Sequence, residues 1–241
     1  MLEVPFVTIR IFPYVAAALM LQALAGCSDK NSADNAAASP QAKVDAAPAT
    51  TPAADGKLIL AFGDSLYAGY GVGPNESFPV KLQAALMKRG ISASVVNAGV
   101  SGDTSAAGLN RLAFTLEGLP RKPDLAMINL GGNDMLRGID PAETRANLTE
   151  ICEELHKRGI PIVLTGMVSA PNMGRNYAER FNPIYAELAR KFGAALYPFF
   201  LEGVITDRAL MQADSIHPNP KGVDIIVGKV APLVVSKLES K

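Results

Sequence analysis

Five short apolar runs alternate with longer amphipathic segments from residue 57 onwards. Each run is almost continuously apolar, which is typical of strands in a parallel sheet that is covered on both faces. The sequence therefore predicts five buried strands, KLILAF, ASVVNA, DLAMINL, PIVLTGM and AALYPFF, at 57–62, 93–98, 124–130, 161–167 and 194–200.

The intervals between these runs show helical periodicity. The segments with this pattern are 78–89, 104–116, 141–158, 176–192 and, as a final helix, 221–240. Strands that alternate with helices predict a doubly wound α/β sandwich, in which helices cover both faces of the sheet.

Polar clusters stand where three of the predicted strands end. GDSL, with Asp64 and Ser65, follows the first strand, NAGVSGDT overlaps the end of the second, and GGND follows the third. Asp64 or Ser65 alone could simply cap the next turn. However, the carboxyl ends of parallel strands line the ligand crevice in such folds. We therefore expect the three clusters to converge on one site.

Residues 1–56 have a different character from the rest of the chain. IFPYVAAALMLQAL is shorter than the roughly 20 apolar residues of a membrane span, so it predicts a signal peptide at 1–26. LAGC at 24–27 resembles the lipobox of bacterial lipoproteins, which implies lipidation of Cys27. The alternative is a cysteine that stands by chance beside a plain cleavage site. The Ala- and Pro-rich segment that follows predicts a disordered tether at 27–56, before a working domain at 57–241.

Composition narrows the function classes. The chain has 23 basic and 23 acidic residues, and it has no basic stripe, which argues against nucleic acid as a partner. It contains neither CxxC nor HExxH, and GYGVG lacks the spacing of a dinucleotide site, so we expect no metal and no cofactor. Cys152 lies in a helical pattern and is predicted to be a small buried residue rather than a nucleophile.

A serine nucleophile needs a base, and the chain has two histidines. His156 falls in the last turn of a predicted helix, where the helix dipole favours it. His217 precedes a proline, which places it in a loop, and Asp214 stands three residues earlier. If Ser65 reacts, His217 is the only plausible base, and Asp214 could orient its ring.

An acyl-transfer reaction also needs donors for the developing oxyanion. The candidates are the Ser65 amide, the Gly102 amide and the Asn133 side chain. In each case the alternative is a structural role in a turn or loop. The spacing G-x-S-x-G is not met, because Tyr67 stands at the final glycine position, so the serine does not lie in an α/β-hydrolase nucleophile elbow.

Four segments in order, FGDSLYAGYG, NAGVSGDTSAAGLNRL, LGGNDMLRGI and DSIHPN, resemble the successive blocks of the GDSL, or SGNH, hydrolases. The resemblance is greatest to the bacterial thioesterase I/protease I/lysophospholipase group, which is often called the arylesterases. It implies a flavodoxin-like three-layer α/β/α sandwich with a five-stranded parallel sheet.

The resemblance also implies roles for individual residues. Ser65, Asp214 and His217 would form the catalytic triad, Asp64 would support the serine loop, and Ser65, Gly102 and Asn133 would form the oxyanion hole. A mobile substrate loop bordering the acyl-chain site would comprise Met135, Leu136, Arg137, Gly138, Ile139 and Asp140.

We therefore expect a cofactor-independent serine esterase for aryl or acyl esters, with thioesterase and lysophospholipase activity as further expectations. The alternatives are an acyltransferase that uses the same acyl-enzyme and a non-catalytic lipid-binding lipoprotein. The expected partner is a small-molecule ester or lysophospholipid. We expect a monomer on the periplasmic face, in contact with the outer membrane only through the Cys27 lipid.

Overall fold

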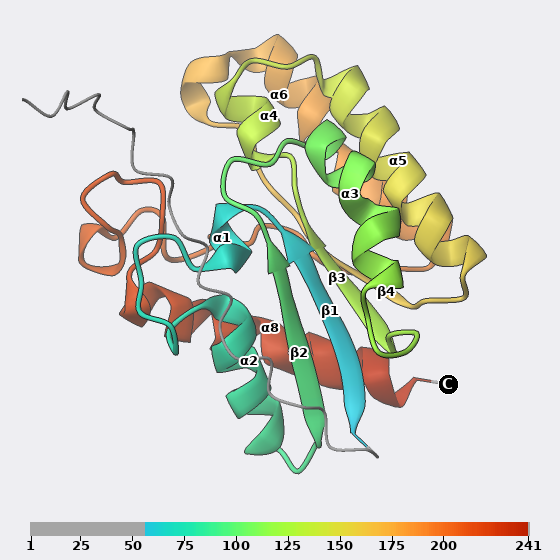
Figure 1. Ribbon diagram of the computed structural model, residues 1–241. Helices are drawn as coiled ribbons and strands as arrows, with labels where there is room; N and C mark the ends of the chain where they lie inside the picture. The colour runs from blue at the N-terminus through green and yellow to red at the C-terminus, as the bar shows by residue number, and fades with distance from the viewer. Residues whose placement is uncertain (1–55, 241) are drawn as a thin grey trace, which may run out of the picture. The chain divides into compact units, whose positions relative to one another are not determined.

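The predicted strands form one parallel sheet of five strands, in the order β2-β1-β3-β4-β5 (Figure 1). The computed structural model describes residues 56–240, so the predicted signal peptide, Cys27 and the tether before Gly56 lie outside it. The strands are β1 (Lys57–Gly63), β2 (Ala93–Gly99), β3 (Leu125–Asn129), β4 (Ile162–Thr165) and β5 (Ala195–Tyr197).

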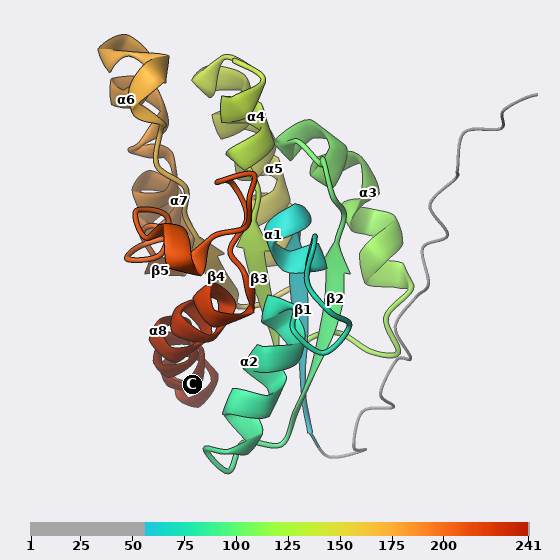
Figure 2. The same cartoon turned by 90° about the vertical axis from the view of Figure 1, so that its left-hand side faces the viewer.

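Helices cover both faces of the sheet (Figures 1 and 2). One face carries α2 (Phe78–Met87) and α8 (Pro220–Glu239), and the other carries α3 (Ser105–Glu117), α5 (Pro141–Lys157) and α7 (Ile184–Phe192). This arrangement confirms the predicted three-layer α/β/α sandwich. The shorter helices are α1 (Ser65–Ala68), α4 (Gly132–Leu136), α6 (Arg175–Phe181), η1 (Pro171–Met173) and η2 (Arg208–Leu210).

The central strands carry the core of the domain. All five residues of β3 are buried, as are six of the seven residues of β1. The prediction of a fully buried strand is wrong for the two edge strands. The three residues of β5 are only half-buried, and only two of the seven residues of β2 are buried.

The prediction of one helix over 176–192 is also wrong, because α6 and α7 are separate helices with Asn182 and Pro183 between them. Proline has no N–H to continue a helical ladder, and it disfavours helical geometry at the residue before it. Asn182 uses the break to accept a 2.8 Å hydrogen bond from the Ser169 amide with its side-chain Oδ1.

The strand order places a crevice at the carboxyl edge of the sheet. The chain leaves β1 towards α2 on one face and leaves β3 towards α5 on the other (Figure 1). Neighbouring parallel strands with diverging connections leave a gap at their ends, and ligands of such folds bind there. Among residues 56–240, no helix is long and apolar enough to cross a membrane.

Candidate active site

Ser65 is the first residue of α1, directly after β1. Asp64 caps this short helix, because its Oδ1 accepts a 3.0 Å hydrogen bond from the Leu66 amide. Gly99 at the end of β2 lets α1 approach closely, since a Cβ there would lie 2.3 Å from the Ala68 nitrogen. Ser65 is therefore held, half-buried, at the edge of the crevice.

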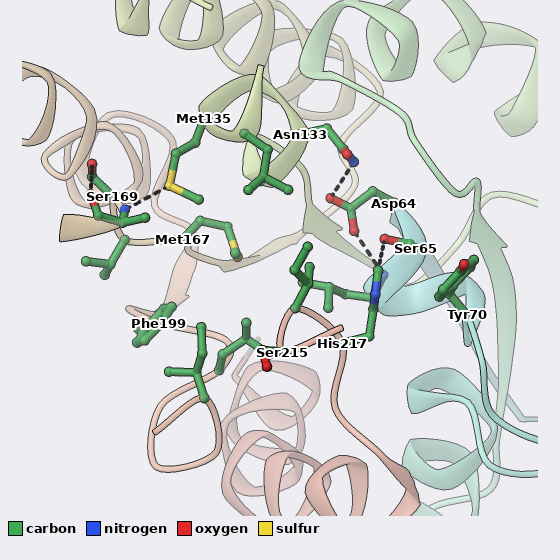
Figure 3. A pocket seen from close by; sticks show the side chains of 18 of the residues that line it. Asp64, Ser65, Tyr70, Asn133, Met135, Met167, Ser169, Phe199, Ser215 and His217 are labelled. Atoms are coloured by element: carbon green, nitrogen blue, oxygen red, sulfur yellow. Dashed lines mark hydrogen bonds between the residues drawn. The ribbon is translucent and has the colours of Figure 1, made fainter. Parts of the chain in front are cut away.

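The loop before α8 brings His217 to Ser65. His217 Nε2 lies 2.8 Å from Ser65 Oγ, and His217 Nδ1 lies 2.7 Å from Asp214 Oδ2 (Figure 3). The other Asp214 oxygen accepts hydrogen bonds from the backbone amides of Ile216 and His217, at 2.9 and 3.0 Å. These contacts close a tight turn around Ser215, which has a φ of 58°.

The charge on Asp214 fixes which His217 nitrogen carries a hydrogen. Partial burial alone would raise the pKa of Asp214, but the hydrogen bonds from His217 and Ile216 outweigh it and lower this pKa to about 2. An ionised carboxylate only accepts hydrogen bonds, so Nδ1 donates to Asp214. Nε2 of the neutral ring is then free to accept the Ser65 proton, which is the arrangement that a serine nucleophile needs.

Three hydrogen-bond donors lie beside Ser65. Within residues 56–240, the backbone N–H groups of Ser65 and Gly102 donate to no protein acceptor. Asn133 Nδ2 donates to the Asp103 carbonyl at 2.9 Å and lies 3.4 Å from Asp64 Oδ2. Ser65, Gly102 and Asn133 all line the same cavity, so their donors can converge on an oxygen of a bound acyl group.

The cavity has a volume of about 790 Å³, and its wall is mostly apolar. Figure 3 shows Met135, Met167 and Phe199 on one side of the Ser65–His217 pair. The apolar lining residues are Leu66, Met135, Leu136, Met167, Val168, Ala170, Pro171, Phe199, Leu201, Ile205 and Ile216. An apolar trough that leads to a nucleophile can hold a hydrocarbon chain whose carbonyl lies at the serine.

The residues of the predicted substrate loop divide into two groups. Met135 and Leu136 belong to α4 and line the cavity, whereas Arg137, Gly138, Ile139 and Asp140 do not. Arg137 instead donates to the Gly102 carbonyl, and Ile139 and Asp140 contact α6.

The remaining reactive side chains lie elsewhere. His156 is in the last turn of α5, as predicted, where its ring lies 6.0 Å from that of Phe192. Cys152 is fully buried, and burial raises the pKa of its thiol to about 12, so the thiolate that a cysteine nucleophile needs is not formed near neutral pH. Among residues 56–240, no cluster of three or more His, Cys, Asp or Glu side chains could hold a metal ion.

Two residues at the site were missed by sequence reasoning. The Tyr70 ring lies 4.6 Å from the His217 ring, on the side of the Ser65–His217 pair away from the apolar residues (Figure 3). Gln212 Nε2 donates to the backbone carbonyls of Tyr70 and Pro218, at 2.7 and 3.0 Å. The only available signal was position, since Tyr70 is the second-last residue of FGDSLYAGYG and Gln212 stands two residues before DSIHPN begins.

Comparison with known proteins agrees with this geometry. Residues 61–225 match the GDSL-like Lipase/Acylhydrolase family. Esterase TesA of Pseudomonas aeruginosa is 42% identical over 168 residues, which are 70% of this chain and 83% of that protein. Thioesterase 1/protease 1/lysophospholipase L1 of Escherichia coli is 39% identical over 186 residues, 76% of this chain and 86% of that protein.

A solved structure extends the match to the fold. The crystal structure of AlinE4, an SGNH-hydrolase family esterase, has a TM-score of 0.66 and 51% sequence identity, and the match covers 77% of this chain and 98% of that one. The chain therefore belongs to the GDSL, or SGNH, hydrolase family, and it is a carboxylic ester hydrolase of the esterase, arylesterase or thioesterase type.

Proposed function

We propose that this hydrolase works through a Ser65 acyl-enzyme, with His217 as the general base and Asp214 as the residue that orients it. One observation carries the proposal. The contacts Ser65 Oγ–His217 Nε2 and His217 Nδ1–Asp214 Oδ2, of 2.8 and 2.7 Å, form a continuous relay at the wall of the apolar cavity.

The relay supports a two-step reaction. His217 Nε2 takes the Ser65 proton while Oγ attacks the acyl carbonyl, and the carbonyl oxygen becomes negatively charged. Gly102, Asn133 and the Ser65 amide stabilise that oxygen, and His217 returns the proton to the departing alcohol or thiol. Water then attacks the acyl-enzyme and gives a proton to His217. His217 passes this proton to Ser65 Oγ as the bond between Oγ and the acyl carbon breaks, which releases the acid and regenerates Ser65. The charge of Asp214 stabilises the histidine cation that forms in each step.

The lining of the cavity supports an apolar acyl group as the part of the substrate that is recognised. Met135, Met167 and Phe199 offer it hydrocarbon surface, so the leaving group faces the opposite side of Ser65, towards Tyr70 (Figure 3). An aryl alcohol, a thiol or a glycerophospholipid headgroup can all depart in that direction. Aryl esters, acyl thioesters and lysophospholipids are therefore the proposed substrate classes.

The test compares the wild type with Ser65→Ala on p-nitrophenyl esters from acetate to palmitate, a palmitoyl thioester and a palmitoyl lysophospholipid. Removing the nucleophile of a serine triad lowers turnover by about 10⁴-fold or more, and we expect this loss on every substrate that the wild type cleaves. The control is Ser92→Ala, an exposed serine before β2, which should behave as the wild type does. Turnover by Ser65→Ala near the wild-type rate would refute the acyl-enzyme.

We further propose that residues 1–26 export the protein and that a lipid on Cys27 anchors it, with 27–56 as a tether to the hydrolase domain at 57–241. The support is the apolar run that ends at LAGC, followed by a segment too poor in large apolar residues to pack. The resulting location is the periplasmic face of the outer membrane. The proposed working form is a monomer.

A further inference from the structure

The end of α4 and the turn after it, residues 135–140, join two walls of the active site. On the side of the apolar groove this segment has three ties. Met135 Sδ accepts a hydrogen bond from the Ala170 amide at 3.0 Å, the Tyr177 hydroxyl donates to the Ile139 carbonyl at 3.0 Å, and Asp140 pairs with Arg180. Three contacts in six residues hold this segment in one place relative to the groove.

On the other side the segment reaches the proposed oxyanion hole through a single side chain. Arg137 Nη2 donates to the carbonyl oxygen of Gly102 at 2.7 Å. Gly102 has a φ of 87°, a left-handed conformation that favours glycine. Its surroundings are otherwise open, because an added Cβ would meet only Arg137 Nη2, at 3.6 Å, within 4 Å.

The backbone on either side of Gly102 is held in place. The Val100 amide donates to the Gly63 carbonyl at 3.0 Å, and the Asp103 carboxylate pairs with Arg111 at 2.6 Å. The Asp103 amide donates to the Val100 carbonyl at 3.2 Å, and the Asp103 carbonyl accepts from Asn133 Nδ2 at 2.9 Å. Between these two contacts, the bond from Arg137 is the one that holds the Gly102 carbonyl. The Gly102 carbonyl lies in the Gly102–Asp103 peptide, whereas the Gly102 N–H lies in the Ser101–Gly102 peptide. The two planes meet at the Gly102 Cα, where no side chain limits rotation, so the bond from Arg137 restricts the φ and ψ through which the N–H can turn.

We propose that Arg137 is a positioning residue that fixes the Gly102 backbone so that its N–H points at the substrate carbonyl oxygen. This inference rests on the proposed function, in which Gly102 is an oxyanion donor. Arg137 does not line the cavity, and it acts by keeping one donor aligned before the reaction begins. A donor held in place costs no reorganisation when charge develops in the transition state.

The experiment measures kcat and KM for Arg137→Ala on a neutral p-nitrophenyl ester, so that the arginine charge has no counterpart on the substrate. A misaligned donor weakens the transition state more than the bound ester, so we expect kcat to fall about tenfold while KM changes less than about twofold. Arg137→Lys should recover most of the activity, because one ammonium can donate the same single bond. Arg175→Ala is the matched control, since the Arg175 side chain is 89% exposed and its ion pair with Glu179 is long, at 4.0 Å.

A second readout separates positioning from loss of fold. An alkyl boronic acid forms a tetrahedral adduct with a serine and places an oxygen where the oxyanion would lie. Its inhibition constant should rise in Arg137→Ala by the same factor as kcat falls, while the affinity for the matching alkyl alcohol stays constant. An unchanged kcat, a loss confined to KM, or equal weakening of boronic acid and alcohol would overturn the inference.

Asn133→Ala, measured beside these variants, distinguishes an error in the role of Arg137 from an error in the proposed oxyanion hole. If Asn133→Ala loses about a hundredfold in kcat and Arg137→Ala loses nothing, the oxyanion hole stands and only the role of Arg137 is wrong. If Asn133→Ala also keeps full activity, the proposed oxyanion hole itself is wrong, and the role of Arg137 is wrong with it.

Discussion

Two carboxylates at the site, Asp64 beside Ser65 and Asp214 beside His217, differ in how readily they ionise. Burial raises the pKa of Asp64 to about 7, although the hydrogen bond from the Leu66 amide opposes this, and the charges of Asp103 and Asp134 raise it further. For Asp214, hydrogen bonds from His217 and Ile216 outweigh burial and lower the pKa to about 2. The environments assign the roles, because only a carboxylate that stays charged can stabilise the histidine cation.

The raised pKa of Asp64 predicts a loss of stability as the pH rises. The unfolded chain releases this proton near pH 3.8, whereas the folded chain holds it up to about pH 7. The stability that the bound proton gives is complete below pH 3.8 and is lost as the pH rises through 7. From this group alone, the free energy of unfolding falls by about 1.4 kcal/mol per pH unit across that window.

Asp64→Asn should lack this contribution, because an amide keeps an acceptor for the Leu66 amide and does not titrate. Urea unfolding at about pH 4.5, 5.5, 6.5 and 7.5 measures the difference between variant and wild type. The free energy of unfolding of Asp64→Asn, relative to that of the wild type, should increase with each rise in pH. Glu117→Gln, at the exposed end of α3, serves as the control. A constant difference across the series would contradict a buried, protonated Asp64.

At the scale of elements, the site depends on two loops that no regular hydrogen-bond ladder joins. The loop after α1 carries Tyr70, and the loop before α8 carries His217. Gln212 ties them together by donating to a carbonyl of each loop. Gly71 makes the close approach feasible, since a Cβ there would lie 2.0 Å from Gln212 Oε1 and its φ of 72° favours glycine.

Gln212→Ala should therefore lower kcat several-fold and also lower the melting temperature, because the His217 loop loses its link to the Tyr70 loop. Gln83→Ala is the matched control: its Oε1 accepts from the Val95 amide at 2.9 Å, at the edge of the sheet. That variant should lose stability but keep kcat. Steady-state kinetics and thermal melts of both variants test this prediction. If Gln212→Ala and Gln83→Ala change kcat by the same factor, Gln212 matters only for folding.

Helices, strands and site segments could be predicted where the local sequence pattern alone determines them. The strand runs and GDSL, GGND and DSIHPN are local, so the sheet and the meeting of Ser65 with His217 could be expected from the sequence. Pro183 is a local signal for a break between two helices. The helical periodicity on both sides of it nevertheless led to the prediction of one continuous helix. The half-burial of β5 was not predictable, because only the strand order places it at the edge.

At the scale of the whole molecule, most of the lining of the apolar cavity was not predictable from the sequence, although Met135 and Leu136 were expected to border it. Met135, Met167, Phe199, Ile205 and Ile216 line it from four separate segments, and they share no spacing or motif. Each is an ordinary apolar residue when considered alone. Only the packing of the connections around one end of the sheet makes them neighbours.

The proposed anchor belongs to the same scale, because it concerns where the whole domain works. Cys27→Ser should remove the lipid while leaving the hydrolase domain intact. When cells are fed an alkyne-bearing fatty acid, the wild type should become labelled and collect with membranes, and the variant should do neither. Unchanged membrane association without labelling would indicate another means of attachment. Esterase activity per molecule should be equal in both proteins.

The pair formed by Ser65 and His217 makes activity depend on synthesis and folding of nearly the whole domain. Ser65 and His217 stand 152 residues apart, so during synthesis the serine leaves the ribosome long before its base exists. A partly made or partly folded chain holds an ordinary, unactivated hydroxyl, which cannot attack an ester. Esterase activity can appear only after the loop before α8 has packed against the loop that carries Ser65. The recovery of activity during refolding therefore measures the folding of the entire domain.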